Sequence, residues 1–185
     1  MTRQIFTIGH GTKTLAELVA ILRAAGVKLV VDVRRFPGSR RHPHFGKESL
    51  EASLPPCDIG YEWWGEGLGG RRSRNKDSPA RHPAWRVAAF QAYADYMDTD
   101  DFRRALERLE VTATDRGPVA IMCSETLWWK CHRRLISDSL ALRGARVVHL
   151  LGEGKRQDHV VNPSARPDDE GFPIYDVAIT STLDI

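Results

Sequence analysis

The segment Met122–Arg134, with the sequence MCSETLWWKCHRR, concentrates side chains that can carry out chemistry. It holds two thiols, a carboxylate, two indoles and an imidazole, together with three cationic side chains. The apolar run PVAIM (118–122) leads into it and predicts a buried strand. A reactive site, a metal site, an anion-binding loop and the polar start of a helix are all compatible with this composition.

Cys123 is the candidate nucleophile of this segment. It lies among cations where a strand ends and a helix follows, a setting that lowers the pKa of a thiol and favours the thiolate. The alternative is an inert core thiol, because free cysteine is among the most buried residue types. His10, at the end of another predicted strand, and Glu125 are the candidates for proton transfer. Each has a structural alternative: His10 could cap a backbone carbonyl, and Glu125 could pair with an arginine.

Basic side chains gather in three separate segments, although the formal net charge is only +3. The planar guanidinium group matches phosphate and carboxylate, and an indole can stack on a nucleic-acid base. Segments that converge in space would form an anion site, whereas scattered ones would be solvated faces. The predicted substrate-binding residues are Arg34, Arg40, Arg41, Arg133 and Trp128.

A metal site is a weaker hypothesis. Cys123, Cys131 and His132 do not match a standard zinc spacing, and neighbouring residues in a helix point in different directions. The spacing of His132 with Leu135 and Ile136 favours a buried, hydrogen-bonded imidazole. We therefore expect no metal and no cofactor, and a small structural metal site stays open as an alternative.

Two strand-helix-strand units are expected to position these groups, and the two strands of the first unit are expected to pair in parallel. The first has strands at 4–9 and 27–34 around a helix that ends near Gly26, with Thr14 and Glu17 in a capping box. The second has strands at 118–123 and 145–152 around a helix that ends at Gly144. A strand at 59–64 and two helices within 84–110, the second capped by Thr99, complete the predicted elements.

These elements predict a single α/β domain with a central, mainly parallel sheet and helices on both faces. We expect a core domain at 1–151, with long basic loops at 35–48 and 65–83, and an extension at 152–185 that packs on the core or trails from it. In open α/β sheets, ligands bind outside the carboxyl ends of the strands, where side chains after three of the predicted strands should meet.

The order of elements also distantly resembles rhodanese-like domains. In a rhodanese or phosphatase loop the cysteine and arginine share a tight anion cradle. Here the first arginine follows Cys123 by ten positions, so neither signature is matched.

Composition excludes several classes of protein. The hydrophobic content is 42%, and no apolar stretch has the length needed to span a bilayer. The start MTRQIFTIGH lacks the apolar region of a secretory signal, so a cytoplasmic location is expected. Three cysteines, an odd number, argue against a disulfide framework and leave the thiols available for packing, metal or chemistry.

Four motifs together resemble the domain-of-unknown-function family 488 over roughly residues 4–151. They are TIGHGTKTLAELVAILRAAGVKLVVDVRRFPGSRRHPHF, LGGRR, YADYM and MCSETLWWKCHRRLISD. The family has no established reaction, so the resemblance bears on the fold and the place of the site. Family members commonly have serine where this chain has Gly11.

The resulting hypothesis is an enzyme with an arginine-rich anion-binding cleft at the carboxyl edge of the sheet. It would act on a phosphate-bearing or nucleic-acid-related substrate, with Cys123 as nucleophile. The alternative is a non-catalytic nucleic-acid-binding module in which Cys123 only packs. The expected partner is thus an anionic small molecule or a nucleic acid, and not a membrane.

Overall fold

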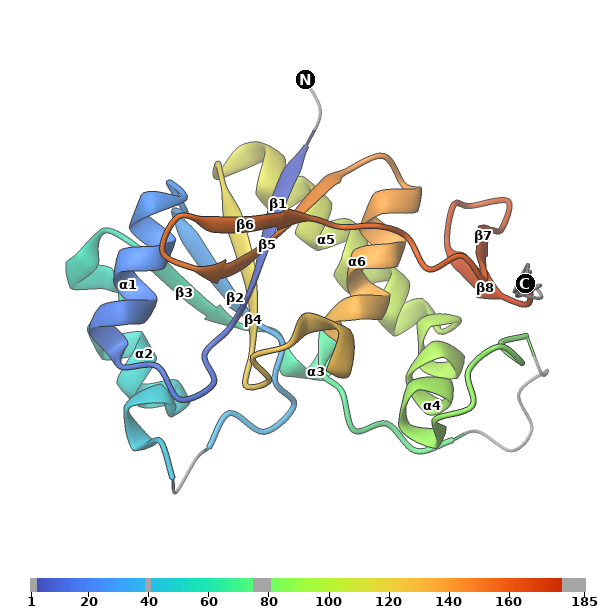
Figure 1. Cartoon of the computed structure of the whole chain (residues 1–185), viewed down its shortest axis with the longest axis horizontal. Helices are drawn as coiled ribbons and strands as arrows, with labels where there is room; N and C mark the ends of the chain where they lie inside the picture. The colour runs from blue at the N-terminus through green and yellow to red at the C-terminus, as the bar shows by residue number, and fades with distance from the viewer. Residues whose placement is uncertain (1–2, 39–40, 75–80, 178–185) are drawn as a thin grey trace, which may run out of the picture.

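A six-stranded sheet forms the centre of the molecule, in the order β3-β2-β4-β1-β5-β6 (Figure 1). The computed structural model describes residues 3–38, 41–74 and 81–177. The strands are β1 (Gln4–Gly9), β2 (Leu29–Asp32), β3 (Gly60–Trp63), β4 (Val119–Cys123), β5 (Arg146–Gly152) and β6 (Lys155–Asp158). The first five pair in parallel, and β6 adds an antiparallel edge strand. The predicted, mainly parallel sheet is confirmed.

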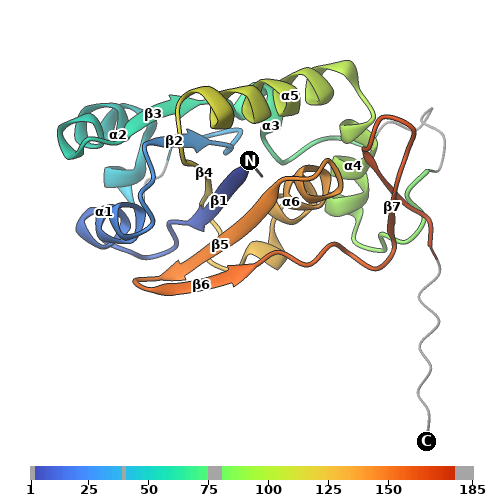
Figure 2. The ribbon, with the colours of Figure 1, turned by 90° about the horizontal axis from the view of Figure 1, so that it is seen from above.

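Helices cover both faces of this sheet, also as predicted (Figure 2). The α-helices are α1 (Leu15–Ala24), α2 (Lys47–Ser53), α3 (Gly65–Leu68), α4 (Ala88–Met97), α5 (Asp100–Asp115) and α6 (Arg133–Leu142). Short 3-10 helices are η1 (Pro43–Phe45), η2 (Pro55–Cys57) and η3 (Trp128–Lys130). Strand side chains alternate between faces, so Phe6 packs with α1 and α2, whereas Ile5 packs with α4, α5 and α6.

The helix ends follow the local sequence signals. The capping box of α1 is present, because Thr14 Oγ1 accepts from the Glu17 amide at 3.2 Å and Glu17 Oε2 accepts from the Thr14 amide at 2.6 Å. Thr99 Oγ1 caps α5 by accepting from the Phe102 amide at 3.4 Å. Gly144 follows α6 at a φ of 86°, a left-handed conformation that favours glycine.

Two expectations about arrangement need correction. The strands of the first predicted unit, β1 and β2, are parallel but not adjacent, because β4 lies between them and pairs with both. The expected loop at 35–48 is shorter, since η1 and α2 begin within it. Pro43 occupies the first position of η1, where a missing N–H costs no helical hydrogen bond. The loop expected at 65–83 likewise begins with the single turn of α3.

The chain after β5 is held against the domain by the buried carboxylate of Asp138 on α6. This carboxylate accepts hydrogen bonds from Tyr175 Oη at 2.8 Å, His159 Nε2 at 2.9 Å and the Asn162 amide at 2.9 Å. A small two-stranded sheet of β7 (Ala165–Pro167) and β8 (Pro173–Tyr175) lies in the same region. The division of the chain at residue 152 stays a prediction. Within the described ranges, no helix is long and apolar enough to cross a membrane.

Candidate functional site

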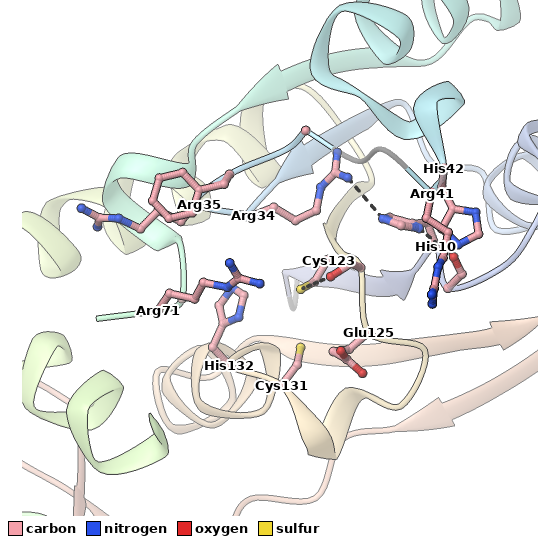
Figure 3. A pocket seen from close by; sticks show the side chains of 15 residues that line it. His10, Arg34, Arg35, Arg41, His42, Arg71, Cys123, Glu125, Cys131 and His132 are labelled. Carbon is pink, nitrogen blue, oxygen red and sulfur yellow. Dashed lines mark hydrogen bonds between the residues drawn. The ribbon is translucent and has the colours of Figure 1, made fainter. Parts of the chain in front are cut away.

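A cleft of about 450 Å³ lies at the carboxyl ends of β1, β2 and β4 (Figure 3). This is the edge at which open α/β sheets bind ligands. The lining comes from loops that are far apart in the sequence. Its residues are His10, Gly11, Arg34, Arg35, Phe36, Gly38, Arg41, His42, Gly70, Arg71, Cys123, Ser124, Glu125, Cys131 and His132.

Cys123 is the last residue of β4 and retains 5% exposure at the cleft. Its Sγ, the Sγ of Cys131 and one ring nitrogen of His132 all lie within 4.8 Å of one another. Hydrogen bonding with Cys131, the largest influence, and with His132 holds the pKa of the Cys123 thiol well below its usual range, although burial opposes this shift. Burial and the neighbouring Cys123 raise the pKa of Cys131. The two thiols are therefore chemically distinct.

The imidazole of His132 is held by the backbone. Its Nε2 lies 2.9 Å from the Val33 carbonyl oxygen, which can only accept, so Nε2 carries a proton. The other ring nitrogen, Nδ1, packs on Gly70, where an added Cβ would lie 2.8 Å from it. The expected hydrogen bond is present, but the ring is half-buried at the cleft and not buried as expected.

Cys131 and His132 both reach the cleft, contrary to the expectation that a helix would separate them. The helix α6 begins at Arg133 with His132 as its N-cap, and Cys131 has an extended backbone at φ −137° and ψ 166°. Cys131 is therefore outside the helix, and the rule that neighbouring helical side chains point in different directions does not apply to it.

With Cys123, these residues form a Cys2His set whose ligand atoms are close enough together to hold a metal ion such as zinc. Competing with this is the buried guanidinium of Arg133, whose Nε donates to Cys131 Sγ at 3.2 Å. It already supplies positive charge at that sulfur. The absence of a metal stays a prediction.

Arg34 is engaged inside the protein. Its Nε lies 2.9 and 3.1 Å from the two carboxylate oxygens of buried Asp32, and its Nη2 donates to Asp32 Oδ2 at 2.5 Å and to the Phe45 carbonyl at 2.8 Å. Asp32 also accepts from Tyr61 Oη at 2.7 Å. The remaining nitrogen, Nη1, donates to His10 Nε2 at 3.2 Å. Sequence reasoning identified Arg34 and His10 but missed Asp32 and Tyr61, which fix them.

His10 is a neutral, positioned imidazole. Burial lowers its pKa to about 4, and the charge of Arg34 acts in the same direction. Its Nδ1 donates to the Gly11 carbonyl at 3.0 Å, while Nε2 accepts from Arg34. The ring stacks on Phe45 with centroids 4.3 Å apart. Both ring nitrogens therefore have protein partners.

The loop after Cys123 packs tightly on the end of β1. The His10 amide donates to the Cys123 carbonyl at 3.0 Å, and the Gly11 amide donates to the Ser124 carbonyl at 2.9 Å. A Cβ at Gly9 would lie 1.9 Å from the backbone oxygen of Glu125. Gly11 has a φ of 52°, and its added Cβ would lie 2.2 Å from Thr126 Oγ1. The exposed Glu125 side chain is thus presented to the cleft from a fixed backbone.

Two predicted substrate-binding residues do not line the cleft. Arg133 is buried and donates to Cys131 Sγ and to the Glu125 carbonyl, so it holds two residues that line the cleft. Trp128 stacks on His149 with centroids 4.0 Å apart and donates to Gln157 Oε1 at 3.2 Å.

A third predicted residue, Arg40, lies outside the described residues. Arg41 lines the cleft, as do Arg35 and Arg71, which the site prediction did not name. The basic composition of their loops was the available signal. Figure 3 shows the Arg71 side chain extending toward His132.

The parallel sheet, with thiol, imidazole and guanidinium groups at its carboxyl edge, defines an α/β protein with a cysteine-bearing cleft. A family model described as "Domain of unknown function DUF488" matches residues 14–140, and the chain belongs to this family. Comparison with curated proteins and with solved structures gave no match.

Proposed function

We propose that the protein is an enzyme that binds a phosphate-bearing or nucleic-acid-related anion in this cleft and attacks it with Cys123. The observation that carries the proposal is the placement of Cys123, which lies beside His132 in a cleft that four arginines also line, three of them besides the ion-paired Arg34. Those three are Arg35, Arg41 and Arg71. Within the described part of the chain, no ion pair engages any of them.

In the proposed reaction, the Cys123 thiolate forms a bond to the electrophilic atom of the substrate. The leaving group departs with its bonding electron pair and takes the proton that the Cys123 thiol passed to His132. Glu125, exposed at the same cleft, then takes a proton from water. The water oxygen bonds to the same substrate atom, the bond from that atom to Cys123 Sγ breaks, and the sulfur leaves as the thiolate. The proton on Glu125 returns to His132 through solvent. His10 and Arg34 position this edge of the cleft, because their hydrogen-bonding groups are directed at each other and at the protein.

A non-catalytic nucleic-acid-binding module is the second candidate, and one observation favours it. Phe36 lines the cleft with 65% exposure and is flanked by arginines along its loop. Exposed aromatic rings beside cations are typical of surfaces on which single-stranded bases stack. In this alternative Phe36 takes the stacking role that the sequence assigned to Trp128, and Cys123 only packs.

The enzyme hypothesis is tested by pulsed alkylation with iodoacetamide across a pH series. Peptide mass spectrometry then reports how fast Cys123 reacts at each pH. We expect Cys123 to react at lower pH in the folded protein than in urea, and we expect His132→Gln to remove most of this difference. Inorganic phosphate should slow the reaction. A Cys123 that reacts no faster when folded would contradict the nucleophile and favour the binding module.

A comparison of two arginine variants tests whether phosphate binds in the cleft. Arg71→Met should weaken the phosphate protection of Cys123, because Arg71 lines the cleft. Arg104→Met is the control, since Arg104 is an exposed arginine on α5 that pairs with Asp101. Equal loss in both variants would show that phosphate acts through general screening and not at the cleft.

A further inference from the structure

Cys123 and Cys131 place two sulfur atoms in one cleft, from segments separated by the irregular stretch 124–130 (Figure 3). Their Sγ atoms lie within 4.8 Å of each other. The third cysteine, Cys57, lies on η2 and packs against the core on the opposite face of the sheet. We propose that Cys123 and Cys131 form a reversible disulfide, which makes the cleft a redox-active dithiol site.

The chain between the two cysteines permits the sulfur atoms to approach. A disulfide needs an S–S distance of about 2.05 Å, so the atoms must move closer than they are in the dithiol. Rotation about each Cα–Cβ bond moves the sulfur, and residues 124–130 belong to neither a strand nor an α-helix. A backbone adjustment in this stretch can therefore accompany the approach without a change in the pairing of β4 with its neighbouring strands.

The groups around the two thiols suit a stepwise oxidation by a small hydroperoxide. The sulfur of Cys123, as thiolate, attacks one peroxide oxygen; an S–O bond forms, the O–O bond breaks, and the alcohol or water leaves with one proton. The sulfur of Cys131 then attacks the Cys123 sulfur; the S–S bond forms, the S–O bond breaks, and hydroxide leaves as water with the proton of the Cys131 thiol. The peroxide is reduced by two electrons, and the two thiols supply them.

Arg133 favours the second step. Its backbone amide and its Nε donate to Cys131 Sγ at 3.4 and 3.2 Å, contacts that stabilise negative charge on this sulfur as it attacks. Arg133 itself is 1% exposed and is fixed by its bond to the Glu125 carbonyl. The inference rests on this dithiol geometry and does not require the proposed function.

Trypsin makes the disulfide directly visible, because Lys130 lies between the two cysteines. Digestion separates the peptide GPVAIMCSETLWWK (117–130) from CHR (131–133). The full-length protein is treated with dilute hydrogen peroxide, its remaining thiols are alkylated, and it is digested without reductant. We expect the two peptides to be joined in most molecules, the link to disappear after dithiothreitol, and the Cys57 peptide to stay alkylated.

Two variants separate the steps. In Cys131→Ser, Cys123 should stop at the sulfenic acid, which dimedone traps, whereas Cys57→Ser should form the same linked peptides as the wild type. The wild-type digest decides the matter alone if Cys131→Ser does not fold. Three outcomes would overturn the proposal. They are the absence of the linked peptides, a link through Cys57, and oxidation that occurs only after a chelator removes zinc. A link without any pH shift in alkylation would leave the disulfide standing and remove the proposed nucleophile.

Discussion

Replacing Asp32 by asparagine removes the carboxylate that neutralises Arg34 beneath the cleft. Asp32 is fully buried and Arg34 is 6% exposed, and the pair is joined by short contacts from Nε and Nη2. Asparagine keeps the shape but not the charge. The guanidinium of Arg34 would remain buried, with only neutral partners.

This change lowers the free energy of unfolding by several kcal/mol. Breaking a buried ion pair by removing one partner costs about 3–5 kcal/mol, because the other charge is left uncompensated. With a urea m value of about 2 kcal/mol/M, a loss of about 4 kcal/mol lowers the unfolding midpoint by roughly 2 M. This is a large share of the roughly 5–15 kcal/mol that stabilises an ordinary domain.

Urea unfolding followed by circular dichroism measures the effect, and two variants control it. Tyr61→Phe removes one hydrogen bond to the Asp32 carboxylate and should cost about 2 kcal/mol. The double variant Asp32→Asn with Arg34→Met removes both charges and should be more stable than Asp32→Asn alone. A loss below about 1 kcal/mol for Asp32→Asn, or strict additivity in the double variant, would refute the reasoning, since Arg34 would then be solvated and available to a ligand.

Two further predictions concern acid and metal. Burial lowers the pKa of His149 to about 3, so below about pH 6.5 the unfolded chain binds a proton that the folded chain does not. The contribution of His149 to the free energy of unfolding should therefore be full above about pH 6.5 and fall by about 3 kcal/mol toward pH 4. Urea titrations should show a shallower fall in His149→Gln, and an unchanged fall would exclude His149 as a source. Elemental analysis should find no stoichiometric transition metal, because Arg133 already faces the Cys131 sulfur. One zinc per chain, lost together with the fold on chelation, would show the opposite.

Local patterns predicted most of the elements but not their neighbours in the sheet. The buried strands and the amphipathic helices carry their periodicity in the sequence, and the Thr14 cap carries its own signature. The position of β4 between β1 and β2 depends on contacts between residues more than 80 positions apart, such as Gly9 with Cys123. No short-range pattern encodes that order.

The site was predictable to a similar extent. The rule that ligands bind at strand carboxyl ends placed Cys123, His10 and Arg34 at one edge. The pair of Asp32 and Arg34 could also have been found, since residues two apart in an extended chain lie on the same side. The meeting of His132 with the two thiols could not, because it depends on α6 starting at Arg133 and helix ends are uncertain by one or two residues.

Arginines at the cleft and beneath it differ in burial, and the difference has consequences for their response to salt. Arg34 and Arg133 are buried and donate hydrogen bonds to Asp32, to backbone carbonyls and to the Cys131 sulfur. Salt should therefore hardly change their electrostatic effect on the thiols.

Arg41 and Arg71 are exposed at the cleft, and their attraction for a bound anion should weaken as ionic strength rises. Ionic strength therefore separates the two roles of the positive charge. Phosphate protection of Cys123 should decline in salt, while the low pH at which the folded thiol reacts should persist, because buried contacts maintain it.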